Sequence, residues 1–217
     1  IDPITFNIDV NQIESKITSK TKAIIPVHLF GLSADMNPIN KIAKQHNLWV
    51  VEDAACGFGA QYYGQHVGTL GDAGCFSFHP RKSITTGEGG MVTTNGEELW
   101  KKMWAYRDHG KAFEQEFHSK NSNGNFINGY WPHISFGTNW RLTEMQSALG
   151  RYQIKKMEEW SRKRRANSNR IKEACRKIPS LRVTEFPDYI DHACYKYFVF
   201  VRSEKLKQGW TRNRIVE

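Results

Sequence analysis

Long apolar runs and paired cysteines are both missing from this sequence. No segment of its 217 residues approaches the roughly 20 apolar residues of a membrane span, so we expect no membrane partner. None of its four cysteines belongs to a CxxC pair or stands at metal-ligand spacing from a histidine, so we predict no metal site. No signal peptide is visible at Ile1, and unpaired cysteines fit a reducing compartment, so we expect a cytoplasmic protein. Cys75 lies in an apolar segment and is expected to be a buried free thiol.

Acidic residues are fewer than basic ones, with 22 Asp and Glu against 31 Lys and Arg. Residues 151–177 hold most of the difference, with 11 Lys and Arg against 3 Glu. Such a segment is either a basic face for nucleic acid and other anions or a solvated helix face. Its basic residues are not interleaved with aromatics as in a stacking platform for bases. We therefore favour the solvated face and expect no nucleic-acid partner.

The first half of the chain alternates strand and helix signals. Residues 1–20 resemble a short strand followed by a short helix, and residues 23–29 a strand interrupted by a proline. A helix is expected from Asp35 or Asn37 to about His46, and a strand over residues 48–51. This strand, helix, strand order at short spacing predicts a parallel α/β unit with a right-handed crossover.

The second half of the chain contains a long loop and long helical segments. A helix is expected over residues 97–106 and a long loop over 107–138, and such long loops in compact domains are usually functional or disordered. Thr143 and Gln146 match a capping box at the start of a helix that continues, with interruptions, to about Ile178. An apolar stripe that includes Met145 and Leu149 gives this helix a packing face. Residues 181–186 and 195–201 are expected to be strands.

Asp53 follows the strand over residues 48–51 and is placed at its carboxyl end. Ligands of open α/β sheets bind at that edge, and an acid there needs a partner because burying an unpaired carboxylate is costly. The alternative is a helix N-cap, since Asp53 directly precedes Ala54 and Ala55. The residues alone leave both readings open.

Residues 71–94 carry one lysine between two expected strands. An apolar run over 73–78 ends before Pro80, Lys82 follows, and the glycine-rich residues 87–90 let the backbone pass close to another group. A lysine in a dry site can form a Schiff base with an aldehyde, whereas most lysines in surface loops are ordinary. With Asp53 only 29 residues before it, Lys82 suggests pyridoxal phosphate chemistry, in which the acid pairs with the pyridine nitrogen.

Several segments in one order resemble the sugar aminotransferases of the DegT/DnrJ/StrS group. The similarity covers most of the chain, up to about Val201. Its motifs are Val51-Glu52-Asp53-Ala54-Ala55, Gly71-Asp72, Ser77-Phe78-His79-Pro80-Arg81-Lys82, Thr85-Thr86-Gly87-Glu88-Gly89-Gly90 and Asn139-Trp140-Arg141-Leu142-Thr143-Glu144-Met145-Gln146.

The resemblance implies a fold type I pyridoxal phosphate-dependent transferase that acts as a homodimer with a shared active site. Its α/β fold has a mostly parallel seven-stranded sheet with helices on both faces and a small C-terminal α/β domain. On this pattern residues 1–140 belong to the large cofactor-binding domain, 141–178 form a long connecting helix, and 179–217 start the small domain. The family's chains are longer at both ends, so we expect an internal fragment that lacks the N-terminal part of the large domain.

Position by position, the resemblance implies that Lys82 is the catalytic Schiff-base lysine and Asp53 the partner of the pyridine nitrogen. Ser77 matches a phosphate ligand, and Asn139 the residue that reaches the phosphate of the neighbouring subunit's cofactor. Cys56 departs from the pattern, because the family usually has Gln or His beside the cofactor's phenolic oxygen.

Two further residues, His79 and Arg141, keep alternative roles, and a third has one expected role. His79 could contact substrate or cofactor, or pack beside Pro80. His28 is expected to be structural. Arg141 could meet phosphate or pair locally.

The resemblance implies amino transfer from glutamate or glutamine to a nucleotide-linked keto sugar, in polysaccharide or amino-sugar biosynthesis. Related sugar dehydratases carry His in place of the lysine, so Lys82 argues for amino transfer. The alternative is a non-catalytic or regulatory protein on the same scaffold. The loop over residues 107–138 is a candidate for contacts with the sugar.

Overall fold

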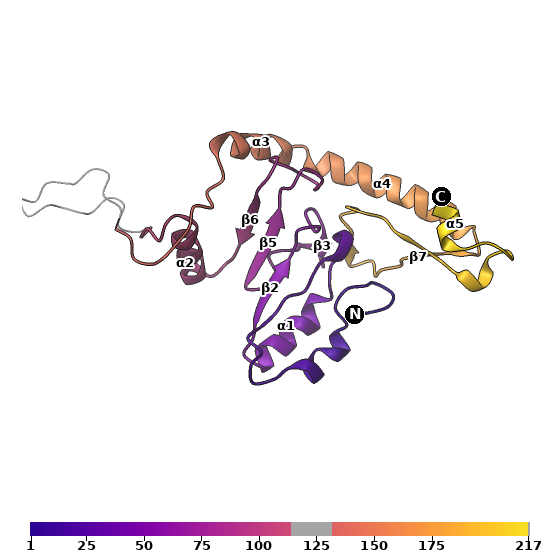
Figure 1. Ribbon diagram of the computed structural model, residues 1–217, viewed down its shortest axis with the longest axis horizontal. Coiled ribbons are helices and arrows are strands. Elements are labelled where there is room, and N and C mark those ends of the chain that lie inside the picture. Colours follow the sequence, from indigo (N-terminus) through magenta and orange to yellow (C-terminus); the bar gives the residue numbers. More distant parts are fainter. Residues whose placement is uncertain (114–131, 217) are drawn as a thin grey trace, which may run out of the picture.

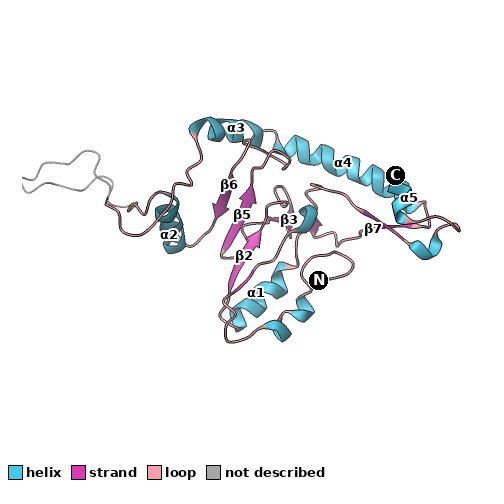
Figure 2. Cartoon of the chain, viewed as in Figure 1, coloured by secondary structure: helices cyan, strands magenta, loops and turns pink. Residues whose placement is uncertain are grey.

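The computed structural model describes residues 1–113 and 132–216. The helices are α1 (Met36–Gln45), α2 (Glu97–Arg107), α3 (Glu144–Ile154), α4 (Met157–Arg176) and α5 (Arg212–Val216), with the 3-10 helices η1 (Val10–Gln12), η2 (Glu14–Lys16), η3 (Leu29–Gly31) and η4 (Ser203–Lys205). The strands are β1 (Ala23–Ile24), β2 (Trp49–Asp53), β3 (Gln61–Tyr62), β4 (Gln65–His66), β5 (Ala73–Ser77), β6 (Gly90–Thr93), β7 (Leu181–Val183), β8 (Ile190–Asp191) and β9 (Val199–Val201). After β1 and α1, five strands follow one another along the chain, and α2, α3 and α4 then precede the C-terminal strands (Figures 1 and 2).

The central sheet has the strand order β1-β2-β5-β6. β1 and β2 are parallel, β2 and β5 are parallel, and β5 and β6 are antiparallel. The expected parallel unit is therefore confirmed. Of the expected seven strands, the part of the chain that the structure describes supplies these four, and the larger sheet stays a prediction.

One face of this sheet is covered by helices. Ile39 and Ala43 of α1 pack with Ile24 and Val50 in the largest apolar core cluster. Further along the same face, Met157 in the first turn of α4 packs with Phe78 and Ile84. On the opposite face Ile25, Trp49 and Val92 stay exposed, so the described residues do not supply helices to both faces.

The long helical region is divided in two. The predicted capping box is confirmed, because Thr143 accepts a hydrogen bond from the Gln146 amide and the Gln146 side chain accepts one from the Thr143 amide. The expected interruption falls between Ile154 and Met157, where α3 ends and α4 begins. The apolar stripe on α3 is present but exposed, with Met145 at 84% and Leu149 at 42%.

Two smaller sheets extend the fold beyond the central one. β3 pairs with β4 and with β8, so residues close to the site and residues 190–191 share one sheet. β7 pairs with β9 and lies against α4. Both β7 and β9 are shorter than the strands expected over residues 181–186 and 195–201, and residues 4–8 form no strand.

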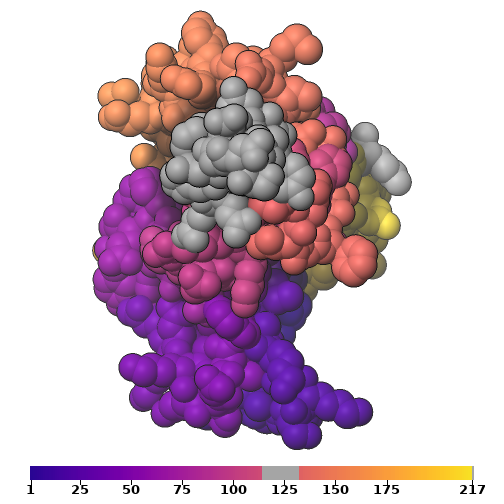
Figure 3. Space-filling model, turned by 90° about the vertical axis from the view of Figure 1, so that its left-hand side faces the viewer, coloured from indigo at the N-terminus to yellow at the C-terminus, as the bar shows by residue number. Residues whose placement is uncertain are grey.

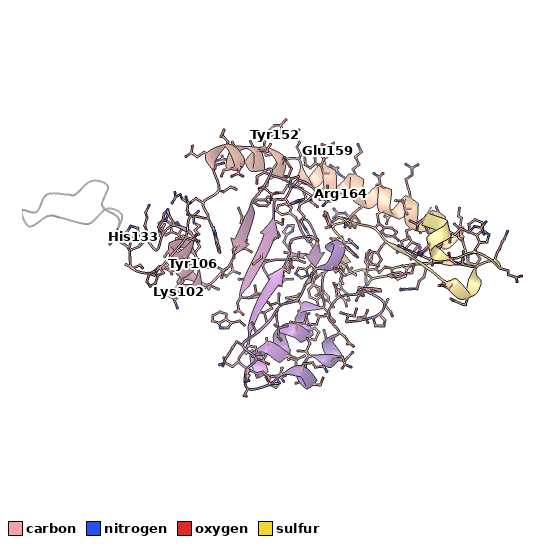
Figure 4. The ribbon with its side chains drawn as sticks, in the orientation of Figure 1. Lys102, Tyr106, His133, Tyr152, Glu159 and Arg164 are labelled. Atoms are coloured by element: carbon pink, nitrogen blue, oxygen red, sulfur yellow. The ribbon has the colours of Figure 1, made fainter. Side chains whose placement is uncertain are left out.

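The N-terminal residues lie at the opposite end of the molecule from α3 and the start of α4. Figure 3 shows this in a view from the left-hand side of Figure 1. Lys102, Tyr106 and His133 gather around α2, away from Arg164 on α4 (Figure 4).

Within the described ranges, no helix is both long enough and apolar enough to cross a membrane.

Candidate functional site

The carboxyl ends of β2 and β5 bring Asp53 and Ser77 to one face of the sheet. Asp53 pairs in register with Cys75, and Ser77 lies two residues further along the same strand, so both side chains emerge on the same side. Burial raises the pKa of the Cys75 thiol, and the Asp53 charge adds to this. Cys75 is a free thiol as expected, but it is half-buried rather than fully buried.

Asp53 is half-buried, and its immediate structure is a turn. Its Oδ1 atom accepts a hydrogen bond from the Ala55 amide at 3.0 Å. No helix begins there, so of the two readings that the sequence left open, the helix N-cap is excluded. The carboxylate therefore retains acceptor capacity toward a ligand.

Lys82 lies in the turn after β5, where its side chain reaches residues from other parts of the chain. Its Nζ atom lies 3.4 Å from the Cys56 Sγ atom and 5.1 Å from the centre of the Tyr195 ring. Cys56 follows Asp53 by three residues, so this contact joins the end of β2 to the lysine. The structure thus brings together the ends of β2 and β5, Lys82 and residues far along the sequence.

A cavity of about 600 Å³ opens beside Lys82. Ser77, His79 and Lys82 line it, as the sequence pattern led us to expect of a site. Arg81, Tyr195 and Lys196 complete the lining, and no acidic side chain of the described ranges is among them. The cavity is therefore strongly cationic.

Sequence analysis did not assign roles to Arg81, Tyr195 or Lys196. Arg81 stands inside the lysine motif, but its position next to Lys82 gave no separate signal. Tyr195 and Lys196 were placed in a strand, whereas the observed strand β9 begins only at Val199. No local signal marks Tyr195, because its segment is held near Lys82 by hydrogen bonds to residues far away in the sequence.

His28 and Glu52 form a buried pair behind the site. The His28 Nε2 atom lies 2.8 Å from Glu52 Oε2, and both side chains are completely buried. Burial alone would raise the pKa of Glu52, but hydrogen bonds from His28 and from the amides of Gly68 and Gly71 outweigh it and hold that pKa below its ordinary value. The structural role expected for His28 is confirmed.

This pair holds the strand end that carries Asp53. The His28 amide donates to the Asp53 carbonyl at 3.0 Å, and the Asp53 amide donates to the Pro26 carbonyl at 2.9 Å. His28 therefore binds β2 twice, through its amide at the Asp53 carbonyl and through its side chain at the Glu52 carboxylate. The position of the Asp53 carboxylate depends on this support.

Asn139 and Arg141 lie apart from the cavity. Asn139 forms an isolated bridge with Asp108, and its Oδ1 atom accepts a weak hydrogen bond from the Arg141 amide at 3.4 Å. Arg141 pairs with the Asp108 carboxylate, so the local pairing is observed, and the alternative of a phosphate contact stays a prediction. Desolvation opposes ionisation of Asp108, but Arg141 and Lys111 hold the pKa of this carboxyl below its ordinary value.

His79 keeps its two possible roles. It lines the cavity, yet its Nδ1 atom also accepts a hydrogen bond from the Arg81 amide at 3.2 Å, which closes the turn before Lys82. Most of the expected long loop lies outside the described residues, and only residues 107–113 and 132–138 of it are placed.

Comparison with known proteins agrees with this geometry. The family model described as DegT/DnrJ/EryC1/StrS aminotransferase family matches residues 1–217. GDP-perosamine synthase of Caulobacter vibrioides is 44% identical over 158 residues, which is 73% of this chain and 39% of that protein. An uncharacterised protein of Methanocaldococcus jannaschii is 38% identical over 98% of this chain and 54% of its own length.

Solved structures give the same result. The aminotransferase of Psychrobacter cryohalolentis is 45% identical, with a TM-score of 0.92 over 100% of this chain and 56% of that one. The S. venezuelae DesV structure, described as a complex with a ketimine intermediate, is 30% identical, with a TM-score of 0.77 over 90% of this chain and 48% of that one. The chain thus spans about half the length of the relatives it matches, and it belongs to the DegT/DnrJ/EryC1/StrS aminotransferase family.

Proposed function

We propose that the protein to which this chain belongs is a pyridoxal phosphate-dependent aminotransferase that transfers nitrogen from glutamate or glutamine to a nucleotide-linked keto sugar. One observation carries the proposal. Lys82 opens onto a cationic cavity at the sheet edge where Asp53 and Ser77 emerge on one face. Relatives named for perosamine, lipopolysaccharide and spore-coat polysaccharide synthesis support a place in polysaccharide biosynthesis.

The residues at this edge fit the cofactor. Lys82 offers an amine for its aldehyde, Asp53 an acceptor for its pyridine N–H, and Ser77 a hydroxyl for its phosphate. Cys56 lies 3.4 Å from the lysine nitrogen, at the position where the family resemblance implies Gln or His. A thiol is a weaker donor toward the phenolic oxygen than either of those side chains. Pyridoxal phosphate, when bound, supplies an electron sink for charge that develops on the substrate carbon.

The roles of the protein groups follow from their chemistry. Lys82, once its nitrogen is free, would move a proton between the donor carbon and the neighbouring carbon as a general base and then a general acid. The Asp53 carboxylate would accept the N–H of the ring, which favours the protonated ring. The turn closed by His79 and Arg81 holds Lys82 against Cys56 and so fixes where the amine lies.

A homodimer with a shared site is part of the proposal. Asn139 is exposed and lies away from the cavity of its own chain, as a residue that serves the neighbouring subunit would. The apolar side chains on the outer side of α3, such as Met145, Leu149 and Tyr152, support a subunit contact there.

The test is a Lys82→Ala variant of the full-length protein, with Lys41→Ala on the exposed side of α1 as its control. After incubation with pyridoxal phosphate and reduction with borohydride, the wild type and the control should carry the cofactor mass on the peptide that contains residue 82. The Lys82→Ala variant should carry none and should not produce pyridoxamine phosphate from glutamate. Full turnover by this variant would overturn the assignment of Lys82.

The alternative of a non-catalytic protein on this scaffold is less well supported. A binding protein has no need for an amine, a carboxylate and a hydroxyl at one sheet edge. Addition of glutamate to the cofactor-loaded wild type separates the two readings, because only a transferase converts the cofactor to its amine form.

A further inference from the structure

The cavity beside Lys82 carries two cations that the proposed chemistry does not use. Arg81 and Lys196 both line it, and both side chains are exposed, whereas Lys82 is half-buried. Among the residues that the structure describes, neither Arg81 nor Lys196 forms an ion pair with an acid. Two unpaired cations at the opening of one cavity form an electrostatic site for an anion.

Lys196 is held in place by the backbone. Its amide donates a hydrogen bond to the Phe30 carbonyl at 3.2 Å, and the Ala193 amide donates to the Gly31 carbonyl at 2.9 Å. The two segments approach so closely that a Cβ atom on Gly31 would lie 2.9 Å from the Ala193 Cβ atom, and Gly31 has a φ of 95°. The segment that carries Tyr195 and Lys196 is thus fixed over η3.

Tyr195 connects this segment to the catalytic lysine. Its ring centre lies 5.1 Å from the Lys82 nitrogen and 5.8 Å from the Lys196 nitrogen. The Lys196 nitrogen also lies 5.7 Å from the ring centre of Phe30. Aromatic faces hold ammonium groups at such distances without neutralising them, so the positive charge of Lys196 stays available to a ligand.

We propose that Arg81 and Lys196 bind the diphosphate group of the nucleotide-linked substrate. This inference rests on the proposed function and deepens it by assigning a binding site for the anionic part of the nucleotide-linked keto sugar. A guanidinium group can bind phosphate oxygens in two parallel hydrogen bonds, and an ammonium group adds a second positive charge.

The depth of the cations distinguishes the diphosphate from the other candidate anion. The carboxylate of an amino-acid donor is bonded directly to the reacting carbon, so it must lie beside the half-buried Lys82. The diphosphate of a nucleotide-linked sugar is several bonds away from the keto carbon, so it reaches toward the solvent. Arg81 and Lys196 are the exposed residues of the cavity lining, which matches the second geometry.

The experiment measures binding to the cofactor-loaded, full-length protein by calorimetry. The probes are UDP, GDP, dTDP and inorganic pyrophosphate, with glutamate as the donor arm. The variants are Arg81→Gln, Lys196→Gln and the double variant, which remove charge while keeping side-chain length. Lys205→Gln is the matched control, because Lys205 is an exposed lysine of the same C-terminal region that does not line the cavity.

Each single substitution should raise the dissociation constant of the best nucleoside diphosphate about tenfold, since a charge-assisted hydrogen bond is lost. The double variant should lose salt-dependent binding, and the control should bind as the wild type does. In these variants the binding of glutamate should weaken much less than the binding of the diphosphate.

Unchanged diphosphate binding in the double variant, or a loss confined to glutamate, would overturn the inference. So would a wild type that binds none of the diphosphates saturably. Failure of the proposed function gives a different pattern, in which diphosphates bind through these residues but borohydride attaches no cofactor to Lys82.

Discussion

Glu52→Gln is the substitution that probes the support of the site most directly. The Glu52 carboxylate accepts four hydrogen bonds, at 2.6 Å from each of the amides of Gly68, Leu70 and Gly71 and at 2.8 Å from His28. Glutamine keeps the shape of the side chain, but its nitrogen cannot accept a hydrogen bond. The variant therefore tests the acceptor capacity of this position rather than its volume.

The expected loss of stability follows from counting donors in each orientation of the amide. With the nitrogen at the Oε1 position, the Leu70 and Gly71 amides both lose their acceptor. With the nitrogen at the Oε2 position, the Gly68 amide loses its acceptor and His28 must change tautomer. That change would cost the Ala34 amide its own bond to His28 Nδ1, now 3.1 Å long. Two buried donors are stranded in either orientation, at about 1–3 kcal/mol each, so we expect a loss of about 3 kcal/mol.

The difference in the free energy of unfolding between the wild type and Glu52→Gln should depend on pH. The folded protein holds the pKa of Glu52 below its ordinary value, so the unfolded chain binds more protons at low pH. The stabilisation is fully present above the unfolded pKa of about 4.3 and is lost as the pH falls through the lower folded value. The gap between wild type and Glu52→Gln should therefore narrow below that pH.

Urea unfolding followed by tryptophan fluorescence, at a series of pH values, measures both effects. Glu14→Gln is the control, because Glu14 and His46 make an exposed pair of the same kind at 3.4 Å, and its loss should cost less than about 1 kcal/mol. A loss of unfolding free energy in Glu52→Gln no larger than that in Glu14→Gln, or a loss independent of pH, would refute this expectation. Either result would show that the Glu52 carboxylate does not stabilise the loop at residues 68–71.

Two further predictions concern the lysine contact and the helix start. Because the Cys56 Sγ atom lies 3.4 Å from Lys82 Nζ, bound pyridoxal phosphate should slow iodoacetamide alkylation of Cys56 about tenfold while Cys175 reacts as before, as mass spectrometry of both peptides would report. Equal reactivity of Cys56 with and without cofactor would contradict the proposed position of the ring. Thr143→Ala removes the capping box of α3 and should cost about 1 kcal/mol in urea unfolding. Arg151→Lys, an exposed change in the same helix that keeps the charge, should cost less than about 0.5 kcal/mol, and equal losses would show that the cap does not stabilise the helix.

The elements best predicted from the sequence are those whose local signals agree with their packing. α1 has apolar residues at helical spacing, and Ile39 and Ala43 are indeed buried. The capping box of Thr143 and Gln146 needs only residues three apart, so no distant contact can displace it. The pairing of β3 with β8 joins segments far apart in the sequence, and periodicity carries no information about such a contact.

Some residues of the candidate site can be predicted from their place in the sequence, whereas others reach the site only through contacts between distant segments. Asp53, Ser77 and Lys82 lie close to strand ends, and the edge of a parallel sheet gathers such positions without any further contact. Tyr195 reaches Lys82 only because the Ala193 and Lys196 amides dock on the turn at Phe30 and Gly31. That docking joins residues more than 100 positions from the lysine, so no local pattern could have placed the phenol in the cavity.

Strand β2 shows how the fold separates support from chemistry. Successive side chains of a strand point to opposite faces, so Glu52 and Asp53 cannot share an environment although they are neighbours in the sequence. Glu52 faces the helix-covered side, where every oxygen is bound and the side chain is fully buried. Asp53 faces the open side, where a single amide occupies one oxygen and leaves capacity for a ligand. A carboxylate that binds a cofactor must keep a free acceptor oxygen, as Asp53 does. Asp53 is nevertheless held in position, because the neighbouring Glu52 uses both of its oxygens to fix β2 to the backbone behind it.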